Sequence, residues 1–188
     1  RSRPVQDLLA AIEARRPRSR PYLLGITGSV AAGKSTLARA LADSLTGAAV
    51  LATDCFLRSN ADLDAAGLTM EKGFPASFRT EALRGVLTEL RDGRPVTLPT
   101  YSHVVYDIDP VATSTLVPAD VVVVEGLHLT RFASDLLHTT VHLDAEEAVL
   151  ERWYLDRFVD LVARARAGEE SFYELFAALD PVELDAVA

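Results

Sequence analysis

An apolar run, a glycine-bounded loop and an amphipathic segment follow one another between Tyr22 and Leu45. The apolar run, YLLGIT at residues 22–27, has the continuous hydrophobicity of a strand that is buried on both faces. The segment from Ser35 to Leu45 carries apolar residues at helical spacing. Strands of this kind occur in parallel sheets, because helices cover both faces of such sheets. This unit therefore indicates an α/β fold.

The same alternation of apolar and amphipathic segments continues along the chain. It predicts further buried strands at residues 48–54, 119–126 and 139–144. It predicts helices at residues 4–14, 80–91, 144–167 and 171–179, with Asp144 in a capping-box position. Residues 60–78 lack periodicity and are expected to be irregular, while prolines within 95–110 favour an extended flap. We expect a parallel sheet that is flanked by helices on both faces.

Length and composition indicate a single domain, residues 1–188, that begins with a helix and a basic linker within residues 1–20. The hydrophobic content of 49% suffices for a covered core, and the net charge of -8 argues against nucleic-acid and membrane-surface partners. The single cysteine, Cys55, excludes an internal disulfide and fits a reducing compartment. Because we find neither a signal peptide nor an apolar run of about 18 residues, we expect a cytoplasmic protein.

The loop after the first strand, GSVAAGKS at residues 28–35, matches the phosphate-binding pattern G-x-x-x-x-G-K-[ST]. Its two glycines allow backbone conformations that turn successive N–H groups inward, and the following helix N-terminus favours an anion. Lys34 is expected to face the outer phosphates of a nucleotide, and the Ser35 hydroxyl suits a Mg²⁺ ligand. A glycine-rich turn with a surface lysine is the alternative. The predicted phosphate-binding residues are Gly28, Ser29, Val30, Ala31, Ala32, Gly33, Lys34, Ser35 and Thr36.

Two acidic residues at the ends of predicted strands suit phosphoryl transfer. Asp54 ends the second strand, where a carboxylate can accept the proton of an attacking alcohol. Glu125 follows four valines, and an acid at this position of such folds orders Mg²⁺. The alternatives are a turn-forming aspartate and a solvated strand-end glutamate. Since no Asn-Lys-x-Asp guanine-reading motif is present, these acids favour a kinase over a GTPase.

The long helix predicted at 144–167 places Tyr154 and Arg157 on one face, because they are three residues apart. The guanidinium can neutralise charge during phosphoryl transfer or bind a substrate carboxylate. An exposed arginine that pairs with Asp160 or Glu151 is the alternative.

A further candidate surface lies in the flap, where His103 stands between Tyr101 and Tyr106 in a chain with 7% aromatic residues. This cluster indicates either a binding surface or an ordinary surface histidine.

Several segments together carry a resemblance to a known family. They are PYLLGITGSVAAGKST (21–36), KGFPASF (72–78), LPTYSHVVYDI (98–108), VVVVEGL (121–127) and WYLDRF (153–158). In this order they closely resemble the bacterial type I pantothenate kinases, a family in the P-loop kinase group that also holds uridine kinase and phosphoribulokinase. The resemblance covers about residues 20–176. It implies a P-loop kinase fold, ATP and Mg²⁺ as cofactors, and a homodimer.

The resemblance also implies roles for individual residues. It makes Asp54 the catalytic carboxylate, and it implies that Lys34 and Arg39 hold the phosphates of coenzyme A as an inhibitor. The residues that match the pantothenate pocket are Tyr101, His103, Tyr106, Tyr154 and Arg157. The chain departs from the family at Cys55, where glycine is usual, and at His128, where asparagine is usual. Chains of that family continue beyond the position of residue 188 with a segment that supplies a substrate-binding asparagine, so we expect either an incomplete sequence or a shorter relative whose pocket closes differently.

These observations lead to one favoured function and two alternatives. The favoured function is ATP-dependent phosphorylation of a primary alcohol of a small metabolite, with pantothenate as the expected acceptor in coenzyme A biosynthesis. Asp54, Lys34 and Arg157 are the predicted catalytic residues, and Ser35 and Glu125 the predicted Mg²⁺ ligands. The alternatives are a kinase of a nucleoside or sugar, and a non-catalytic nucleotide or coenzyme A binding protein. A protein that only binds nucleotide would not need a base at Asp54.

Overall fold

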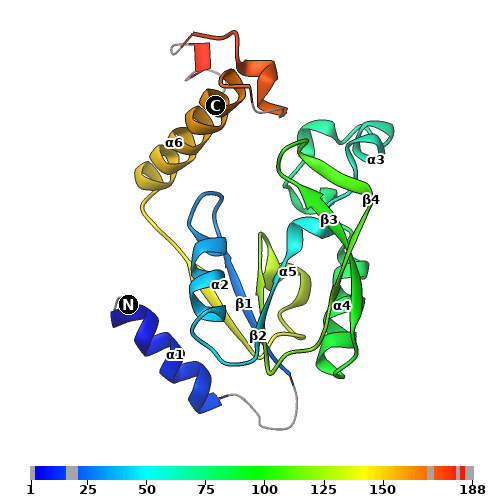
Figure 1. Ribbon diagram of the computed structural model, residues 1–188, viewed down its shortest axis with the longest axis vertical. Helices are drawn as coiled ribbons and strands as arrows, with labels where there is room; N and C mark the ends of the chain where they lie inside the picture. The colour runs from blue at the N-terminus through cyan, green and yellow to red at the C-terminus, as the bar shows by residue number, and fades with distance from the viewer. Residues whose placement is uncertain (1–2, 16–20, 169–171, 181–182, 185–188) are drawn as a thin grey trace.

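The computed structural model describes residues 3–15, 21–168, 172–180 and 183–184 (Figure 1). Its centre is a four-stranded parallel sheet in the order β2–β5–β1–β6. The strands are β1 (Tyr22–Gly28), β2 (Ala48–Ala52), β5 (Val121–Glu125) and β6 (Thr139–Leu143). The continuous apolar runs thus form the predicted parallel sheet.

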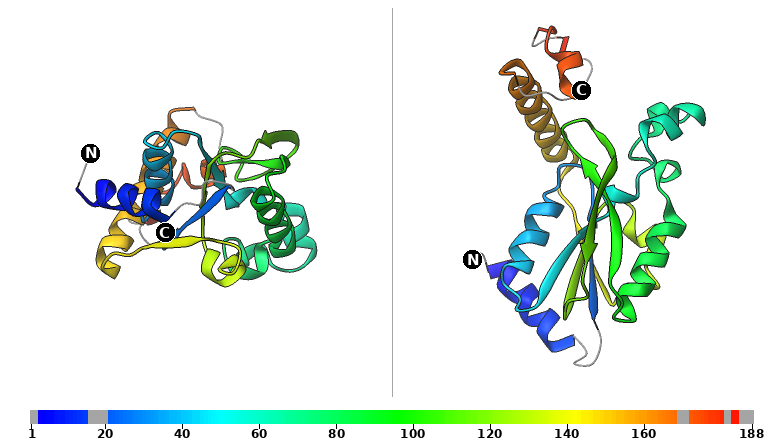
Figure 2. Two further views of the ribbon diagram at one scale, coloured as in Figure 1. Left: turned by 90° about the horizontal axis from the view of Figure 1, so that it is seen from below. Right: turned by 45° about the vertical axis from the view of Figure 1, so that its right-hand side comes forward.

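Helices cover both faces of this sheet, because alternate residues of each strand point to opposite sides. Tyr22, Leu24 and Ile26 pack with α1 (Arg3–Arg15) and α2 (Lys34–Ala42) on one face. Leu23 packs on the other face with α4 (Thr80–Arg91) and α5 (Leu129–Ala133). Figure 2 shows the two helical layers on either side of the sheet. The α/β prediction is confirmed.

The predicted flap is an antiparallel hairpin of β3 (Val96–Ser102) and β4 (Asp107–Leu116), separate from the main sheet. Pro99 and Pro110 lack the N–H that a central strand would donate, which fits a two-stranded element outside the main sheet. The hairpin extends beyond residue 110, because the β-branched residues of β4 continue the pairing to Leu116. Its turn and the helix α6 (Glu147–Arg166) both lie above the carboxyl edge of the sheet (Figure 1).

Residues 60–78 are more regular than predicted. They form α3 (Asn60–Ala65) and two 3₁₀ turns, η2 (Thr69–Glu71) and η3 (Pro75–Ser77). The Ser59 side chain caps α3 by accepting a hydrogen bond from the Asp62 N–H at 3.1 Å. A helix of this length that buries only Leu63 has no apolar period, which is why the pattern did not reveal it.

Two predicted helices differ at their ends or in their type. The last long helix begins after Glu146, so the prediction of Asp144 in a capping box is wrong, and the Asp144 carboxylate accepts from the next N–H instead. The predicted C-terminal helix is a 3₁₀ turn, η4 (Phe172–Phe176), and residue 171 lies outside the described residues. Residues 16–20 of the predicted linker also lie outside them. No helix in the described ranges has the length and apolarity needed to cross a membrane.

The residue after β5 lies so close to the segment after β2 that a larger side chain there should lower the stability of the fold. At Gly126 an added Cβ would lie 1.7 Å from Thr53 Oγ1, so Gly126→Ala must displace Thr53, the neighbour of Asp54. We expect the free energy of unfolding in urea to fall by about 1–3 kcal/mol, as for other overpacked sites. The control is Gly85→Ala, since this exposed helical glycine has nothing within 4 Å of an added Cβ. That variant should gain about 0.5–1 kcal/mol.

Candidate active site

The loop between β1 and α2 needs its two glycines for different reasons. Gly28 lies against β6, where an added Cβ would be 2.2 Å from the carbonyl oxygen of Leu143. At Gly33 an added Cβ would have nothing within 4 Å, but the residue has a φ of 84°, in the left-handed region that favours glycine. Steric space and a φ of 145° therefore both select Gly28, whereas backbone conformation alone selects Gly33.

The start of α2 is arranged to receive an anion. Gly33 is its N-cap and offers no side-chain hydrogen bond to the first-turn N–H groups. The ammonium of Lys34 donates to the carbonyl oxygen of Ser29 at 2.6 Å, which holds it over the loop. Burial lowers the pKa of Lys34, and the nearby carboxylates of Glu125 and Asp54 act against that shift. The loop contains no acidic residue to pair with this buried cation. A bound polyphosphate would supply the negative charge.

Ser35 and Glu125 face each other at the end of the central strand. The Ser35 hydroxyl donates to Glu125 Oε1 at 2.8 Å, and Glu125 is only 7% exposed. Burial raises the pKa of Glu125, while the Ser35 hydrogen bond lowers it. The solvated-glutamate alternative is therefore wrong. No cluster of three histidine, cysteine or acidic residues that could hold a metal occurs in the described part of the chain. The two oxygen donors fit Mg²⁺, which takes few protein ligands and completes its shell with phosphates and water.

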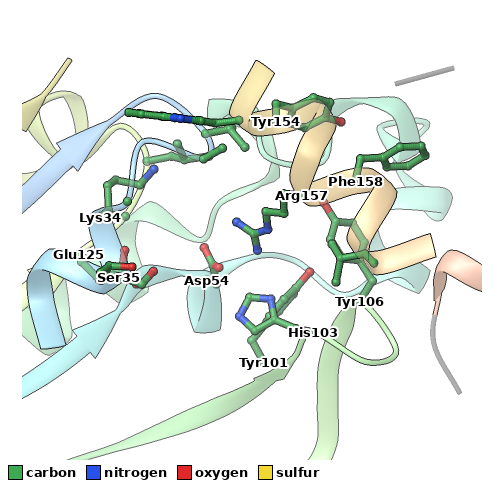
Figure 3. Close-up of a pocket in the computed structure, with 18 of the residues that line it drawn as sticks. Lys34, Ser35, Asp54, Tyr101, His103, Tyr106, Glu125, Tyr154, Arg157 and Phe158 are labelled. Carbon is green, nitrogen blue, oxygen red and sulfur yellow. The ribbon is translucent and has the colours of Figure 1, made fainter. Parts of the chain in front are cut away.

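Asp54 lies in a 3₁₀ turn, η1 (Thr53–Phe56), and not in the strand, because β2 ends at Ala52. The turn buries its other members, and the thiol of Cys55 donates to the Ala52 carbonyl oxygen at 3.2 Å. Burial, with the charge of Asp54, raises the pKa of Cys55 to about 12, so this thiol is unsuited to act as a nucleophile. With its neighbours in the core, Asp54 is left facing the pocket (Figure 3).

One cavity of about 650 Å³ brings most of the predicted site residues together. Figure 3 shows Asp54 near its middle, between Lys34 and Arg157. The predicted residues that line it are Val30, Ala31, Gly33, Lys34, Ser35, Thr36, Arg39, Asp54, Tyr101, His103, Tyr106, Glu125, Tyr154 and Arg157.

Three predicted loop residues are not among those that line this cavity. Gly28 and Ser29 line a second cavity of about 530 Å³, and Val30 lines both cavities. Ala32 is on neither lining, and its N–H donates to the Ser29 carbonyl oxygen within the loop. The loop thus lies between the two cavities.

The side of the pocket away from the loop is built by the hairpin and α6. The ring of Tyr101 contacts those of His103 and Tyr106 edge-on, with centroids 5.0 and 6.1 Å apart. Burial raises the pKa of both tyrosines, so their hydroxyls stay protonated hydrogen-bond donors. Arg157 extends from α6 into the pocket toward Asp54 (Figure 3). This arrangement offers a cation and hydroxyl groups to a second ligand beside the nucleotide.

Sequence reasoning missed an aromatic and apolar wall that completes the pocket. Tyr106 stacks on Phe172 with centroids 5.0 Å apart, and Phe158 contacts Phe176 at 5.3 Å. The segment SFYELF, residues 171–176, contains three aromatic residues in a chain with few, which was the available signal. The lining residues not anticipated as site residues are Gly126, Leu127, Trp153, Phe158, Leu161, Phe172, Tyr173 and Phe176.

Comparison with known proteins relates this pocket to small-molecule kinases. Residues 23–171 match the model of the Phosphoribulokinase / Uridine kinase family. The chain is 36% identical over 187 residues to a pantothenate kinase of Streptococcus pneumoniae (strain 70585), which covers 93% of the chain and 61% of that relative. It is 38% identical over 192 residues to a pantothenate kinase of Bradyrhizobium sp. (strain ORS 278), which covers 92% and 60%. The chain thus spans about three-fifths of the length of these curated relatives.

A solved structure is similar over nearly its whole length. It is a candidate fructose transport system kinase from Silicibacter sp. TM1040, with a TM-score of 0.78 and 25% identity, and the match covers 89% of both chains. The arrangement of the sheet and its helices is therefore shared with that protein.

The phosphate-loop geometry predicts the effect of removing the lysine. Lys34→Ala should keep the fold and weaken ATP binding in isothermal titration calorimetry by about 10- to 100-fold, since a charge-assisted contact contributes about 1.5–3 kcal/mol. Arg94→Ala serves as the control, because Arg94 pairs with Glu89 and Asp92 on the surface. Wild-type affinity in the Lys34 variant would contradict the assignment of this loop to phosphates.

Proposed function

The chain belongs to the Phosphoribulokinase / Uridine kinase family, and from this premise we propose that it phosphorylates pantothenate with ATP. The proposed product is 4′-phosphopantothenate. The observation that carries the proposal is the position of Asp54 in one pocket, between the phosphate loop and Arg157. Two relatives that are 36% and 38% identical are named pantothenate kinases, which supports this acceptor.

The proposed reaction uses the loop to hold ATP and the aspartate to activate the acceptor. N–H groups of the loop and of the α2 N-terminus bind phosphate oxygens, and Lys34 neutralises charge on the outer phosphates. Asp54 accepts the proton of the acceptor hydroxyl as its oxygen bonds to the γ-phosphorus. The bond from that phosphorus to the bridging oxygen breaks, and ADP leaves with the electron pair. The phosphorylated alcohol and a protonated Asp54 remain.

Ser35 and Glu125 would hold Mg²⁺ in this reaction. When bound, the ion neutralises negative charge on the phosphate oxygens. The two side chains already lie close together, because the Ser35 hydroxyl donates a hydrogen bond to the Glu125 carboxylate. Arg157 lies on the opposite side of Asp54 from Lys34 (Figure 3).

The outer half of the pocket fits the chemistry of pantothenate. This acceptor has a carboxylate at one end and hydroxyl groups at the other. The planar guanidinium of Arg157 can bind a carboxylate with two hydrogen bonds. Tyr154, His103 and the tyrosines of the hairpin can donate hydrogen bonds to the middle of the molecule, and Phe172 and Phe176 can cover its apolar part.

A nucleoside or sugar kinase is the second candidate, and one observation favours it. The similar solved structure, with a TM-score of 0.78, is described as a candidate fructose transport system kinase. Sugars and nucleosides lack a carboxylate, so Arg157 would not bind one in such an enzyme. A non-catalytic nucleotide or coenzyme A binding protein is less favoured, because it would not require Asp54 in the pocket.

Coenzyme A is proposed as an inhibitor of the same site. Arg39 and Lys34 line the phosphate end of the pocket, where the two cations can hold its phosphates. A homodimer in the cytoplasm is likewise proposed from the resemblance to the pantothenate kinases. Neither nucleic acid nor membrane lipid is proposed as a partner, because the net charge is -8.

The aspartate provides the first test of this function. Asp54→Asn preserves size but cannot accept a proton at neutral pH, so the rate of phosphoryl transfer should fall by about 10²–10⁴. Binding of ATP, measured by calorimetry, should stay within a few-fold of wild type. The rate is measured as ADP release with pantothenate. Near-normal transfer would mean that Asp54 is a structural turn residue.

The arginine tests the identity of the acceptor. Arg157→Ala should raise the KM for pantothenate by the equivalent of about 1.5–3 kcal/mol, the loss expected for a charge-assisted hydrogen bond. The KM for ATP should change little. The control is Arg164→Ala, two turns further along α6. Steady-state kinetics with both substrates varied provides the measurement, and turnover of uridine or fructose but not pantothenate by the wild type would favour the second candidate.

A further inference from the structure

The KGFP segment contains a lysine with no role in the site described so far. The chain has 19 lysine and arginine residues, and only Lys34 and Lys72 are lysines. Lys34 belongs to the phosphate loop. Lys72 lines the second cavity, together with Gly28, Ser29 and Val30 of the phosphate loop. Its ammonium is a compact charge with three rotatable donors, unlike the planar guanidinium of the chain's arginines.

The ammonium of Lys72 joins α3 to the turn of the hairpin. It donates to the carbonyl oxygen of Tyr106 and, at 2.5 Å, to Oδ1 of Asn60. The Asn60 amide group donates in turn to the same Tyr106 carbonyl at 3.3 Å. The Asn60 backbone N–H donates to Asp107 Oδ1 at 2.9 Å. Two donors from separate segments, the Lys72 ammonium and the Asn60 amide, therefore converge on the Tyr106 carbonyl oxygen.

The same ammonium lies over the rings of the two hairpin tyrosines. Its nitrogen is 4.5 Å from the centroid of Tyr106 and 5.5 Å from that of Tyr101, within the range of cation–π attraction. Burial lowers the pKa of Lys72, and the charges of Asp107 and Asp54 act against this shift. One cation thus contacts both the backbone and the rings of the residues that form the acceptor side of the pocket.

The backbone of Tyr106 explains why such a device is needed. Its φ of 54° is in the left-handed region, which is unfavourable for a bulky residue. A conformation of this kind persists when surrounding contacts hold it. The hydrogen bonds from Lys72 and Asn60 to the Tyr106 carbonyl fix the orientation of that peptide. They therefore also fix the ring of Tyr106, which stacks on Phe172 in the pocket wall.

We propose that Lys72 is a positioning residue for acceptor binding, which holds Tyr106 in its left-handed conformation and sets both tyrosine rings against the acceptor. This inference rests on the proposed kinase function and adds a specificity-determining residue to it. Lys72 acts through the tyrosines and takes no part in the proton transfer. Asn60, the only asparagine of the chain, is its hydrogen-bonding partner in the same role.

Kinetics separate this role from a purely structural one. Lys72→Met keeps the length of the side chain and removes its charge and donors. We expect the KM for pantothenate to rise about tenfold or more, the equivalent of one charge-assisted hydrogen bond, while the KM for ATP stays within about twofold. Asn60→Ala should shift the same constant in the same direction. Arg94→Met removes a surface cation and should change neither constant. A wild-type KM for pantothenate in Lys72→Met would overturn the proposal.

A spectroscopic measurement keeps the proposal testable if Lys72→Met fails to fold. Lysine labelled with ¹³C at Cε gives two signals in the wild-type protein, because the chain has two lysines. The Lys72 protons should be shifted upfield by the tyrosine rings, and Tyr106→Leu should remove part of that shift. Adding pantothenate should move the Lys72 signal, whereas a non-hydrolysable ATP analogue should mainly move that of Lys34. A Lys72 signal that is insensitive to Tyr106→Leu and to pantothenate would refute the proposal.

Failure of the acceptor assignment gives a different result. If the wild type phosphorylates uridine or fructose and not pantothenate, the proposed function is wrong, and the Lys72→Met kinetics are measured with that acceptor. The ring-current test on Tyr106→Leu needs no acceptor. A wild-type KM for the true acceptor in Lys72→Met, combined with normal turnover, would then reject the positioning role by itself.

Discussion

The parallel pairing of β1 with β5 is the constraint on which the rest of the site depends. In this register Ile26 lies opposite Glu125, so the phosphate loop leaves the sheet beside the carboxylate. The hydrogen bond from Ser35 to Glu125 then ties the first turn of α2 to the central strand. A shift in this register would separate these groups. The burial of Glu125 follows from the same pairing.

The acceptor side of the pocket depends on weaker and more distant contacts. The hairpin does not belong to the main sheet, and α6 leaves the end of β6 to stand above it (Figure 1). The two approach each other through Tyr106 and the aromatic residues of η4, and the Phe172 N–H donates to the Val104 carbonyl oxygen at 2.9 Å. Under the proposed function, a change in this half of the site would alter acceptor binding without disturbing the nucleotide.

Charge is divided across the pocket in a way that suits transfer between two ligands. Lys34 and Arg157 lie on either side of Asp54, and Glu125 lies beside the loop (Figure 3). Each buried member has its pKa shifted by loss of solvent, and the neighbouring opposite charges act against that shift. In the proposed reaction, the carboxylate that accepts the proton would therefore lie between two cations.

The sequence by itself determined the sheet, its covering helices and the phosphate loop. Strands that are apolar on both faces are fully buried only when helices cover both sides of the sheet. The spacing of Gly28, Gly33, Lys34 and Ser35 is a local property of the chain. It also identified Tyr101, His103, Tyr106, Tyr154 and Arg157 as candidates. Only the tertiary structure decided that these meet Asp54 in one cavity, that Asp54 leaves the strand in a 3₁₀ turn, and that Lys72 and Asn60 hold Tyr106. Such contacts join segments that are far apart in the chain. The local sequence pattern of one segment does not indicate which distant side chains it will contact.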